Sequence, residues 1–359
     1  MKWERAMGLD VSGKYRYPPP DPEWLGLDSE PVIEPDLPII DAHHHLWIEN
    51  GVPYLGSELM QDLASGHSIE ATVFVQAHYG YRGDLPVELA PIGETEKVRQ
   101  IADSCRSAGC QTRVAEAIVA YADLTLGADV GRVIEAHEQA SGGHLRGIRH
   151  GVSRDPNFPD GIVLRPAAAG LLANTRYRDG LRALTDHGLS YDAMLYHRQI
   201  PELTDLARAM PDLPIILDHM GTKLGVGPYE DLHLETFADW RQSMALLAQC
   251  DNVRVKIGGM GMIICGARWH EAAKPPSSAE LAQAWKPQVE TCIELFGAGR
   301  CMFESNFPVD KAMYSYRTVW NAFKRLTAEA SPDERSALFA GTAAQIYRIT
   351  RPAMQTARG

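Results

Sequence analysis

The sequence predicts a single α/β domain folded as a (β/α)₈ TIM barrel, and two observations carry this prediction. The chain has 359 residues, and roughly 250 suffice for such a barrel. Eight short apolar runs alternate with amphipathic stretches, which predicts parallel strands joined by helical crossovers, and eight strands close a barrel. A doubly wound open sheet is the alternative, but the chain has no glycine-rich nucleotide-binding loop.

The eight predicted strands are the apolar runs, taken in chain order. They are LPIID (37–41), ATVFVQA (71–77), RVAEAIVAY (113–121), LRGIRH (145–150), LSYDAML (189–195), LPIILDH (213–219), VRVKIGG (253–259) and RCMFES (300–305). Stretches with helical periodicity lie between them, most clearly at 94–109, 171–188 and 234–250. Catalytic residues of a TIM barrel stand at the carboxyl ends of the strands, and polar residues close almost every run here.

The ends of the chain differ from its middle. Residues 1–36 are rich in Pro and Asp and lack periodicity, so we expect an N-terminal arm laid over the body. The barrel is predicted at 37–348 and a C-terminal tail at 349–359. No apolar leader opens the sequence and no run of about 18 apolar residues occurs, so we expect a cytoplasmic protein.

Composition narrows the class of partner. The formal net charge is −11 without a cluster of Lys and Arg, which argues against nucleic acid and against an anionic membrane surface. A small-molecule substrate is expected, acidic ones included, because a few local arginines can overcome a weak global field. The six cysteines show no C-x-x-C spacing and are expected to be reduced thiols. A homo-oligomer is compatible with the sequence.

The segment that ends the first predicted strand carries the strongest chemical signal. Asp41, His43 and His45 alternate along an extended chain and are predicted to share one face. Two imidazoles so placed can reach one ion, and neutral imidazole suits Zn²⁺ and similar metals. His197 and His219 also follow apolar runs, and histidine can serve as metal ligand or as proton carrier.

Four segments together resemble the amidohydrolase-related family, in its lactonase-like branch. They are D-A-H-H-H-L-W, R-G-I-R-H, L-D-H-M-G and S-N-F-P-V-D, and the resemblance covers roughly residues 37–348. It implies a (β/α)₈ barrel with a mononuclear or vacant metal site. By this resemblance His43, His45 and His197 would be ligands of one Zn or Mn ion, and His219 would be catalytic. Some lactonases of the family work without metal.

The sequence departs from the family at the eighth strand. Many members carry Gly-Ser-Asp-Trp-Pro there, whereas this chain reads Glu304-Ser305-Asn306-Phe307-Pro308. An amide cannot take up a proton and is a weaker ligand than a carboxylate, so the substitution favours metal-independent chemistry. Glu304 is either the missing catalytic carboxylate or a buried structural one. Asn306 is predicted to position substrate or water, and Asp41 completes the predicted catalytic set.

Four further residues are candidates for substrate binding. Arg146 and Arg149 could pair with a substrate carboxylate or form internal salt bridges. Gln76 and His78 share a face after the second predicted strand and could line the same pocket. The segment 261–278 is predicted to form a loop over the mouth of the barrel, and Lys256 is interpreted as structural.

The sequence therefore predicts a hydrolase for a small lactone or cyclic amide that carries a carboxylate. Water would attack a carbonyl polarised by a metal or directly by the imidazoles, with proton transfer by His219. One alternative is non-oxidative decarboxylation of an unsaturated acid on the same scaffold. Another is a binding barrel that has lost catalysis.

Overall fold

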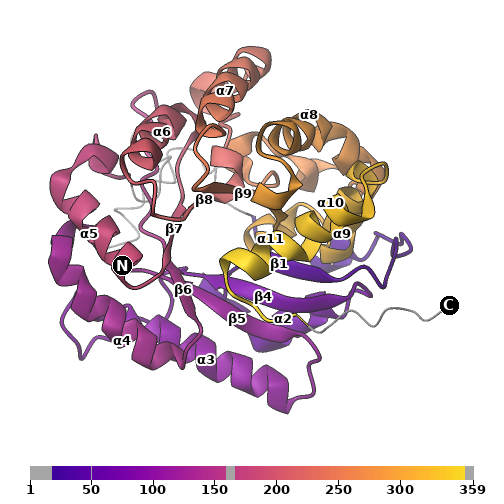
Figure 1. The fold of residues 1–359 in the computed structure, drawn as a ribbon. Coiled ribbons are helices and arrows are strands. Elements are labelled where there is room, and N and C mark those ends of the chain that lie inside the picture. The colour runs from indigo at the N-terminus through magenta and orange to yellow at the C-terminus, as the bar shows by residue number, and fades with distance from the viewer. Residues whose placement is uncertain (1–17, 50, 159–165, 352–359) are drawn as a thin grey trace.

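The computed structural model describes residues 18–49, 51–158 and 166–351, and Figure 1 shows a barrel of strands surrounded by helices. One eight-stranded parallel sheet runs in the order β1-β4-β5-β6-β7-β8-β9-β10. Its strands are β1 (Ile39–His44), β4 (Ile69–Val75), β5 (Arg113–Ala120), β6 (Leu145–Ile148), β7 (Ser190–Ala193), β8 (Ile215–Leu217), β9 (Val253–Ile257) and β10 (Cys301–Phe303). Every one lies within or overlaps a predicted run, so the predicted (β/α)₈ fold is confirmed.

The first and last strands meet at the seam of the barrel. Beyond β10 an isolated parallel bridge joins His44 to Phe307. The amide of His45 donates to the Phe307 carbonyl at 2.8 Å, and the amide of Asn306 donates to the His43 carbonyl at 3.0 Å. Pairing beyond the regular end of β10 thus closes the sheet and places the end of β1 beside residues 304–307.

Helices follow the strands and cover the outside of the sheet (Figure 1). The α-helices are α1 (Pro22–Leu25), α2 (Gly56–Leu63), α3 (Ile92–Ser107), α4 (Gly131–Ser141), α5 (Thr175–Asp186), α6 (Ile200–Ala209), α7 (His233–Leu247), α8 (Ser278–Phe296), α9 (Tyr316–Leu326), α10 (Pro332–Ser336) and α11 (Thr342–Ile346). A small antiparallel pair, β2 (Trp47–Glu49) and β3 (Val52–Tyr54), follows β1. This pair was not predicted from the sequence.

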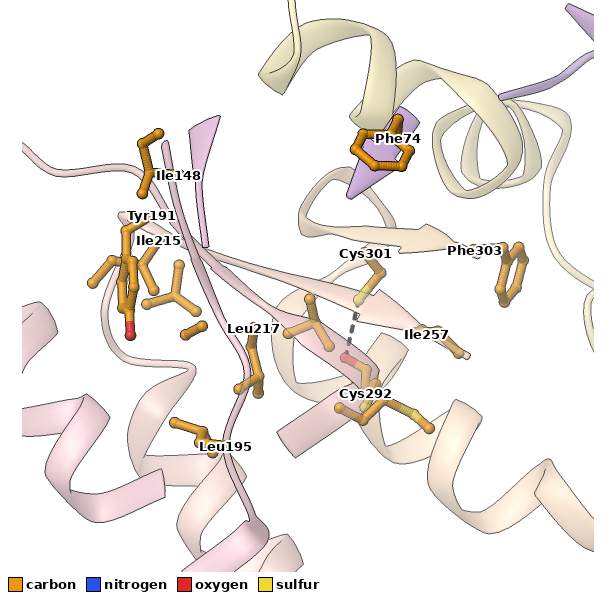
Figure 2. Packing of buried hydrophobic residues seen from close by; sticks show 14 of the residues in the cluster. Phe74, Ile148, Tyr191, Leu195, Ile215, Leu217, Ile257, Cys292, Cys301 and Phe303 are labelled. Atoms are coloured by element: carbon orange, nitrogen blue, oxygen red, sulfur yellow. Dashed lines mark hydrogen bonds between the residues drawn. The ribbon is translucent and has the colours of Figure 1, made fainter. Parts of the chain in front are cut away.

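Alternation along the strands divides the core in two. One set of strand residues packs outward against the helices, as Figure 2 shows for Phe74, Tyr191 and Phe303. The other set forms a separate cluster of Ile40, Ala42, Val73, Val75, Ala117, Val119, Ile216 and Met302, together with Tyr347 from the C-terminal region. This second cluster fills the barrel interior below the polar residues at the strand ends.

The described parts of the predicted arm and tail contact the barrel. The Lys324 ammonium donates to the carbonyls of Ile33 and Glu34 at 2.9 and 2.8 Å, and Ile349 is buried. Residues 1–17 of the arm and 352–359 of the tail lie outside the described residues. All six cysteines are free. In the described part of the chain no helix is both long and apolar enough to cross a bilayer.

Candidate active site

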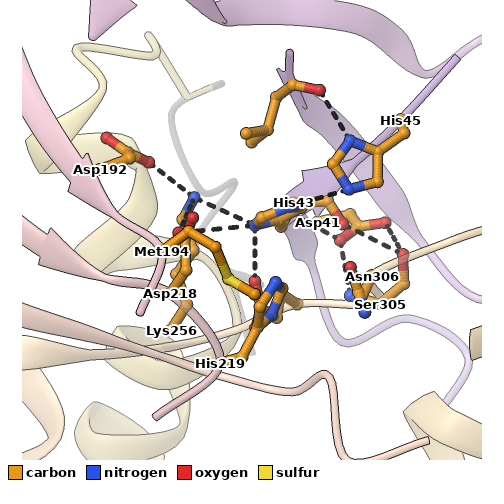
Figure 3. A network of polar contacts seen from close by, with 12 residues as sticks. Asp41, His43, His45, Asp192, Met194, Asp218, His219, Lys256, Ser305 and Asn306 are labelled. Carbon is orange, nitrogen blue, oxygen red and sulfur yellow. Dashed lines mark hydrogen bonds and ion pairs between the residues drawn. The ribbon is translucent and has the colours of Figure 1, made fainter. Parts of the chain in front are cut away.

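Two imidazoles meet at the carboxyl end of β1 (Figure 3). The Nε2 atoms of His43 and His45 lie 3.2 Å apart, and both side chains are buried. His45 Nδ1 lies 2.8 Å from the Val75 carbonyl oxygen. A carbonyl only accepts, so His45 carries its proton on Nδ1 and presents a bare Nε2 toward His43.

Glu304 links this pair to a third imidazole. Its Oε2 lies 2.9 Å from His43 Nδ1, and its Oε1 lies 2.6 Å from His219 Nδ1. The centroids of the His43 and His219 rings are 4.6 Å apart. One fully buried carboxylate therefore orients two imidazoles, and the Nδ1–H of His219 donates to it, which leaves His219 Nε2 as the ring atom free for proton transfer.

The backbone around His219 is held in an unusual conformation. His219, Met220 and Thr222 all have positive φ, at 53°, 54° and 38°. The Trp240 indole donates to the Met220 carbonyl at 2.7 Å and helps to fix this turn. Strain of this kind persists only where the surrounding structure enforces it, and it clusters at functional sites.

Two glycines after β9 make room for the His219–Glu304 pair. A Cβ at Gly259 would lie 2.6 Å from His219 Nδ1, and one at Gly258 would lie 2.3 Å from Glu304 Cγ. Any larger residue at these two positions would displace the pair, so both glycines are required by close approach.

A buried ion-pair network lies beside His43. The Lys256 ammonium is 2.7 Å from Asp192 Oδ2, 3.1 Å from Asp218 Oδ1 and 3.4 Å from His43 Nδ1. Tyr347 donates its hydroxyl to Asp192 at 2.6 Å. Lys256 was interpreted from the sequence as structural and neither aspartate was predicted, because the partners of Lys256 come from β7 and from the end of β8.

Arg149 reaches the site from the end of β6. Its Nη2 donates to the Gln76 carbonyl at 2.5 Å, and its Nη1 lies 3.4 Å from Asp218 Oδ2 and 3.3 Å from His43 Nε2. Its Nε is buried and has no hydrogen-bond partner among the described residues. Arg149 thus brings a positive charge and one uncommitted donor to the imidazole pair.

Burial and neighbouring charges shift the pKa values of these groups in opposite directions. Burial alone would lower the pKa of His219, but the Glu304 carboxylate outweighs it and raises that pKa above the ordinary 6.5. The pKa of His43 is lowered, first by burial and then by the Lys256 ammonium. Burial opposes the ionisation of Asp218, yet Lys256 and His43 hold its pKa well below the usual range. A base with a raised pKa beside a neutral imidazole suits acid–base chemistry.

The donors at the site fit a divalent ion in kind and spacing. Among the described residues, His43, His219 and Glu304 form the group able to offer three ligand atoms within 4.8 Å of one another. Two nitrogens bound to one zinc at about 2.0–2.1 Å in tetrahedral geometry lie roughly 3.3 Å apart, and the His43–His45 separation is 3.2 Å. The opposing feature is positive charge, since Arg149 and Lys256 flank the two ring nitrogens of His43.

Asn306 lies at the seam with a positive φ of 56°. Its Nδ2 donates to Asp310 Oδ1 at 3.0 Å, and its Oδ1 is buried without a hydrogen-bond partner among the described residues. Burial raises the pKa of Asp310 to about 6, although donors from Tyr314 and Gly261 counter it. Asn306, which is predicted to position substrate, thus has its amide nitrogen bound to Asp310, while its amide oxygen accepts no hydrogen bond from the described residues.

Asp41 does not point toward the imidazoles. Its oxygens accept from the Ser305 amide at 2.9 Å, the Ser305 hydroxyl at 2.6 Å, the Tyr316 hydroxyl at 2.9 Å and the His43 amide at 3.3 Å. The β1–β4 pairing is irregular between Asp41 and His44, which breaks the alternation on which the prediction of a shared face relied. The carboxylate joins the two edges of the seam, so the geometry supports a structural role for it.

Two other predicted site residues lie elsewhere. His197 Nδ1 accepts from the Leu224 amide at 3.3 Å and its ring packs edge-on against Tyr229, so it is not part of the group around His43. Arg146 lies near the start of β6 and donates to the Tyr347, Gly143 and Leu145 carbonyls. A barrel puts its chemistry at the opposite, carboxyl ends of the strands.

The remaining candidates lie beyond the end of β4. Gln76 is buried, its backbone carbonyl binds Arg149, and its Oε1 lacks a hydrogen-bond partner among the described residues. His78 has a positive φ of 60°, its Nδ1 lies 2.9 Å from the Tyr81 hydroxyl, and its ring lies against Tyr121. Gln76 therefore adjoins the imidazole site, whereas His78 is part of an aromatic group beside it.

The long segment after β9 helps to form a pocket. Residues Cys265–Trp269 line a cavity of about 400 Å³ that also contacts His219. This agrees with the prediction that segment 261–278 lies at the mouth of the barrel.

Comparison with known proteins places the chain in a family. A family model described as Amidohydrolase matches residues 40–349. An uncharacterized protein of Sinorhizobium fredii, y4mH, is 33% identical over 88% of this chain and 99% of its own length. The L-fucono-1,5-lactonase of Burkholderia ambifaria is 26% identical over 87% of this chain and 96% of its own length.

Solved structures agree on the fold. An amidohydrolase from Burkholderia multivorans, crystallised with zinc, superimposes with a TM-score of 0.65 at 23% identity and covers 87% of this chain and 99% of its own. The family model spans nearly the whole barrel, and one relative is more than 30% identical over most of both chains. The chain belongs to the amidohydrolase family and is a hydrolase built on its (β/α)₈ barrel.

Proposed function

We propose that this protein hydrolyses small lactones, using His219 as general base and acid. The observation that carries the proposal is the buried His219–Glu304 pair, in which Nδ1 and Oε1 lie 2.6 Å apart. Such a carboxylate fixes the tautomer of the imidazole and stabilises its protonated form during the reaction. The lactonase named among the relatives supports this substrate class.

Each step can be assigned to a side chain of this site. His219 Nε2 takes a proton from water, and the hydroxide attacks the carbonyl carbon of the lactone. The uncommitted Nε of Arg149 is a donor suited to the negative charge that develops on the carbonyl oxygen. When the ring C–O bond breaks, His219 returns the proton to the departing alkoxide, so water and lactone become one hydroxy acid.

The other buried polar atoms give the substrate further contacts. Gln76 Oε1 and Asn306 Oδ1 are acceptors without hydrogen-bond partners among the described residues, which suits hydroxyl groups of a substrate. Lys256 holds Asp192 and Asp218 and adds positive charge behind His43. A zinc or manganese ion held by His43, His219 and Glu304 would be an alternative to this imidazole scheme, because it would occupy the ring nitrogen of His219 and supply Lewis-acid polarisation of the carbonyl instead.

A pH-stat assay of five- and six-membered lactones tests the proposal. We expect acid release with some of them and its loss in His219→Asn. Cyclic amides and unsaturated acids are assayed beside the lactones, with CO₂ measured for the acids. Release of CO₂ without lactone hydrolysis would favour the decarboxylase, and binding without turnover of any of these compounds would favour the non-catalytic barrel.

A further inference from the structure

A pocket of about 400 Å³ opens beside the catalytic imidazole. It lies between the segments that follow β8 and β9 and the helices α7 and α8, which are neighbours in Figure 1. Its volume falls within the roughly 300–1,000 Å³ typical of small-molecule sites. The proposed reaction requires only the carbonyl end of a substrate, so this space needs a separate explanation.

Aromatic and thioether side chains form one part of the pocket wall, and polar side chains form another part. Trp240 comes from α7, Trp285 from α8 and Trp269 from the segment after β9, and Met220 and Met260 line the same space. Aromatic faces and flexible thioethers pack against flat or irregular apolar groups. The pocket is therefore suited to an aryl or alkyl group.

Two cationic residues, Lys223 and Arg268, line this space, and Arg268 is exposed and already paired with Glu271 at 2.7 Å. Lys223 lines the pocket and forms no hydrogen bond or ion pair with any residue that the structure describes. Burial lowers the pKa of Lys223, while the neighbouring Cys265 acts in the other direction. A half-buried cation without a partner is costly, and a carboxylate on a ligand would remove that cost.

Arg149, which the sequence suggested as the carboxylate-binding residue, is already engaged. Two of its nitrogens contact the Gln76 carbonyl, Asp218 and His43. Among the described residues Lys223 has no such contacts, and it follows directly on the turn that holds His219, which also lines the pocket. A ligand bound against Lys223 would thus reach the imidazole that performs the proposed proton transfer.

We infer that this pocket binds an apolar group bearing a carboxylate, with Lys223 as its counter-ion, so that the preferred substrates are lactones with an anionic aryl or alkyl side group. That the ligand is a lactone rests on the proposed function, whereas binding of a carboxylate in this pocket does not depend on catalysis. Lys223 is a specificity residue in this scheme and takes no part in bond breaking.

A binding measurement tests the pocket without turnover. Phenylacetate is expected to quench the fluorescence of the pocket tryptophans and to bind about tenfold or more tightly than the neutral phenylacetamide. Lys223→Met should remove that preference and Lys223→Arg should restore much of it. Lys286→Met is the matched control, because Lys286 lies exposed on α8 and pairs with Glu290 at 2.6 Å.

A kinetic measurement uses dihydrocoumarin and its carboxylated derivative. The ratio of kcat/KM for the carboxylated over the neutral lactone should fall about tenfold or more in Lys223→Met, mainly through KM. Lactone hydrolysis without any Lys223-dependent preference would overturn the inference and leave the proposed function standing. Lys223-dependent binding of phenylacetate without lactone hydrolysis would support the pocket and overturn the proposed function.

Discussion

Asp41 and Glu304 are two fully buried carboxylates on adjacent strand ends, and they differ in what surrounds them. Asp41 accepts from neutral donors of Ser305, Tyr316 and the backbone, and because these offset burial only in part its pKa is raised to about 6. Glu304 lies between two imidazoles, and although burial opposes ionisation, His219 and His43 hold its pKa below the usual range. A carboxylate bound by neutral donors fixes the fold, whereas one shared with titratable rings is ready for proton transfer.

Removing the charge of Glu304 should have the largest effect on rate. Glu304→Gln and His219→Asn are each expected to lower kcat by about 10²–10⁴-fold, because both disable the imidazole that carries the proton. Steady-state kinetics and thermal unfolding measure the two consequences separately. His187→Asn is the control, because His187 caps the end of α5 and pairs with Glu138 at 3.0 Å, and full activity in His219→Asn would refute the role assigned to the pair.

Removing the charge of Asp41 should instead affect stability. Asp41→Asn turns an amide donor toward two hydroxyl donors and is expected to cost about 1–3 kcal/mol of the free energy of unfolding, with kcat of the folded enzyme much less affected. The folded pKa of Asp41 exceeds its ordinary value, so this carboxyl destabilises the fold increasingly as pH rises from about 4 to 6. The stability advantage of wild type over the variant should therefore shrink across that interval, as denaturant unfolding at several pH values would show.

The pH–rate profile tests whether Glu304 sets the basicity of His219, and the expected effect on rate is smaller. His219 must be neutral to accept a proton, and its pKa is raised above 6.5. The rate should therefore increase with pH along a limb centred above 6.5, and a Glu304→Gln variant with residual activity should have that limb at lower pH. A limb that stays in place in the variant would mean that Glu304 does not set the basicity of His219.

Metal removal should have the smallest effect. Arg149 Nη1 and Lys256 Nζ lie 3.3 and 3.4 Å from the two ring nitrogens of His43, and like charges so close weaken the binding of a cation. We expect chelator-treated enzyme to keep most of its activity and His197→Asn to leave the metal content unchanged. Metal analysis by mass spectrometry checks both, and activity lost to chelator and regained with Zn²⁺ would contradict the expectation.

The sequence predicted the fold well because its signal is local. Each strand is an apolar run bounded by polar residues, so the runs at 71–77 and 113–121 match β4 and β5 within two residues. The imidazole pair followed from alternation at His43 and His45. These features need no knowledge of distant segments.

The missed parts of the site depend on contacts between strands. Lys256 gains its role from Asp192 and Asp218, which no spacing in the sequence connects to it. Asp41 was assigned to the site because strict alternation was assumed across an irregular end of β1. His197 follows a strand as a ligand would, but its turn directs the ring toward Tyr229.

The seam of the barrel also bears on how the enzyme forms. The contact between Asp41 and Ser305 joins residues 264 positions apart, and bringing together such distant segments carries a large loop-closure cost. The helices and local strand pairs can form before that closure, but the juxtaposition of His43 with Glu304 cannot. In refolding, the helical circular dichroism signal should therefore recover before turnover does. The return of catalytic activity would then mark the closure of the barrel.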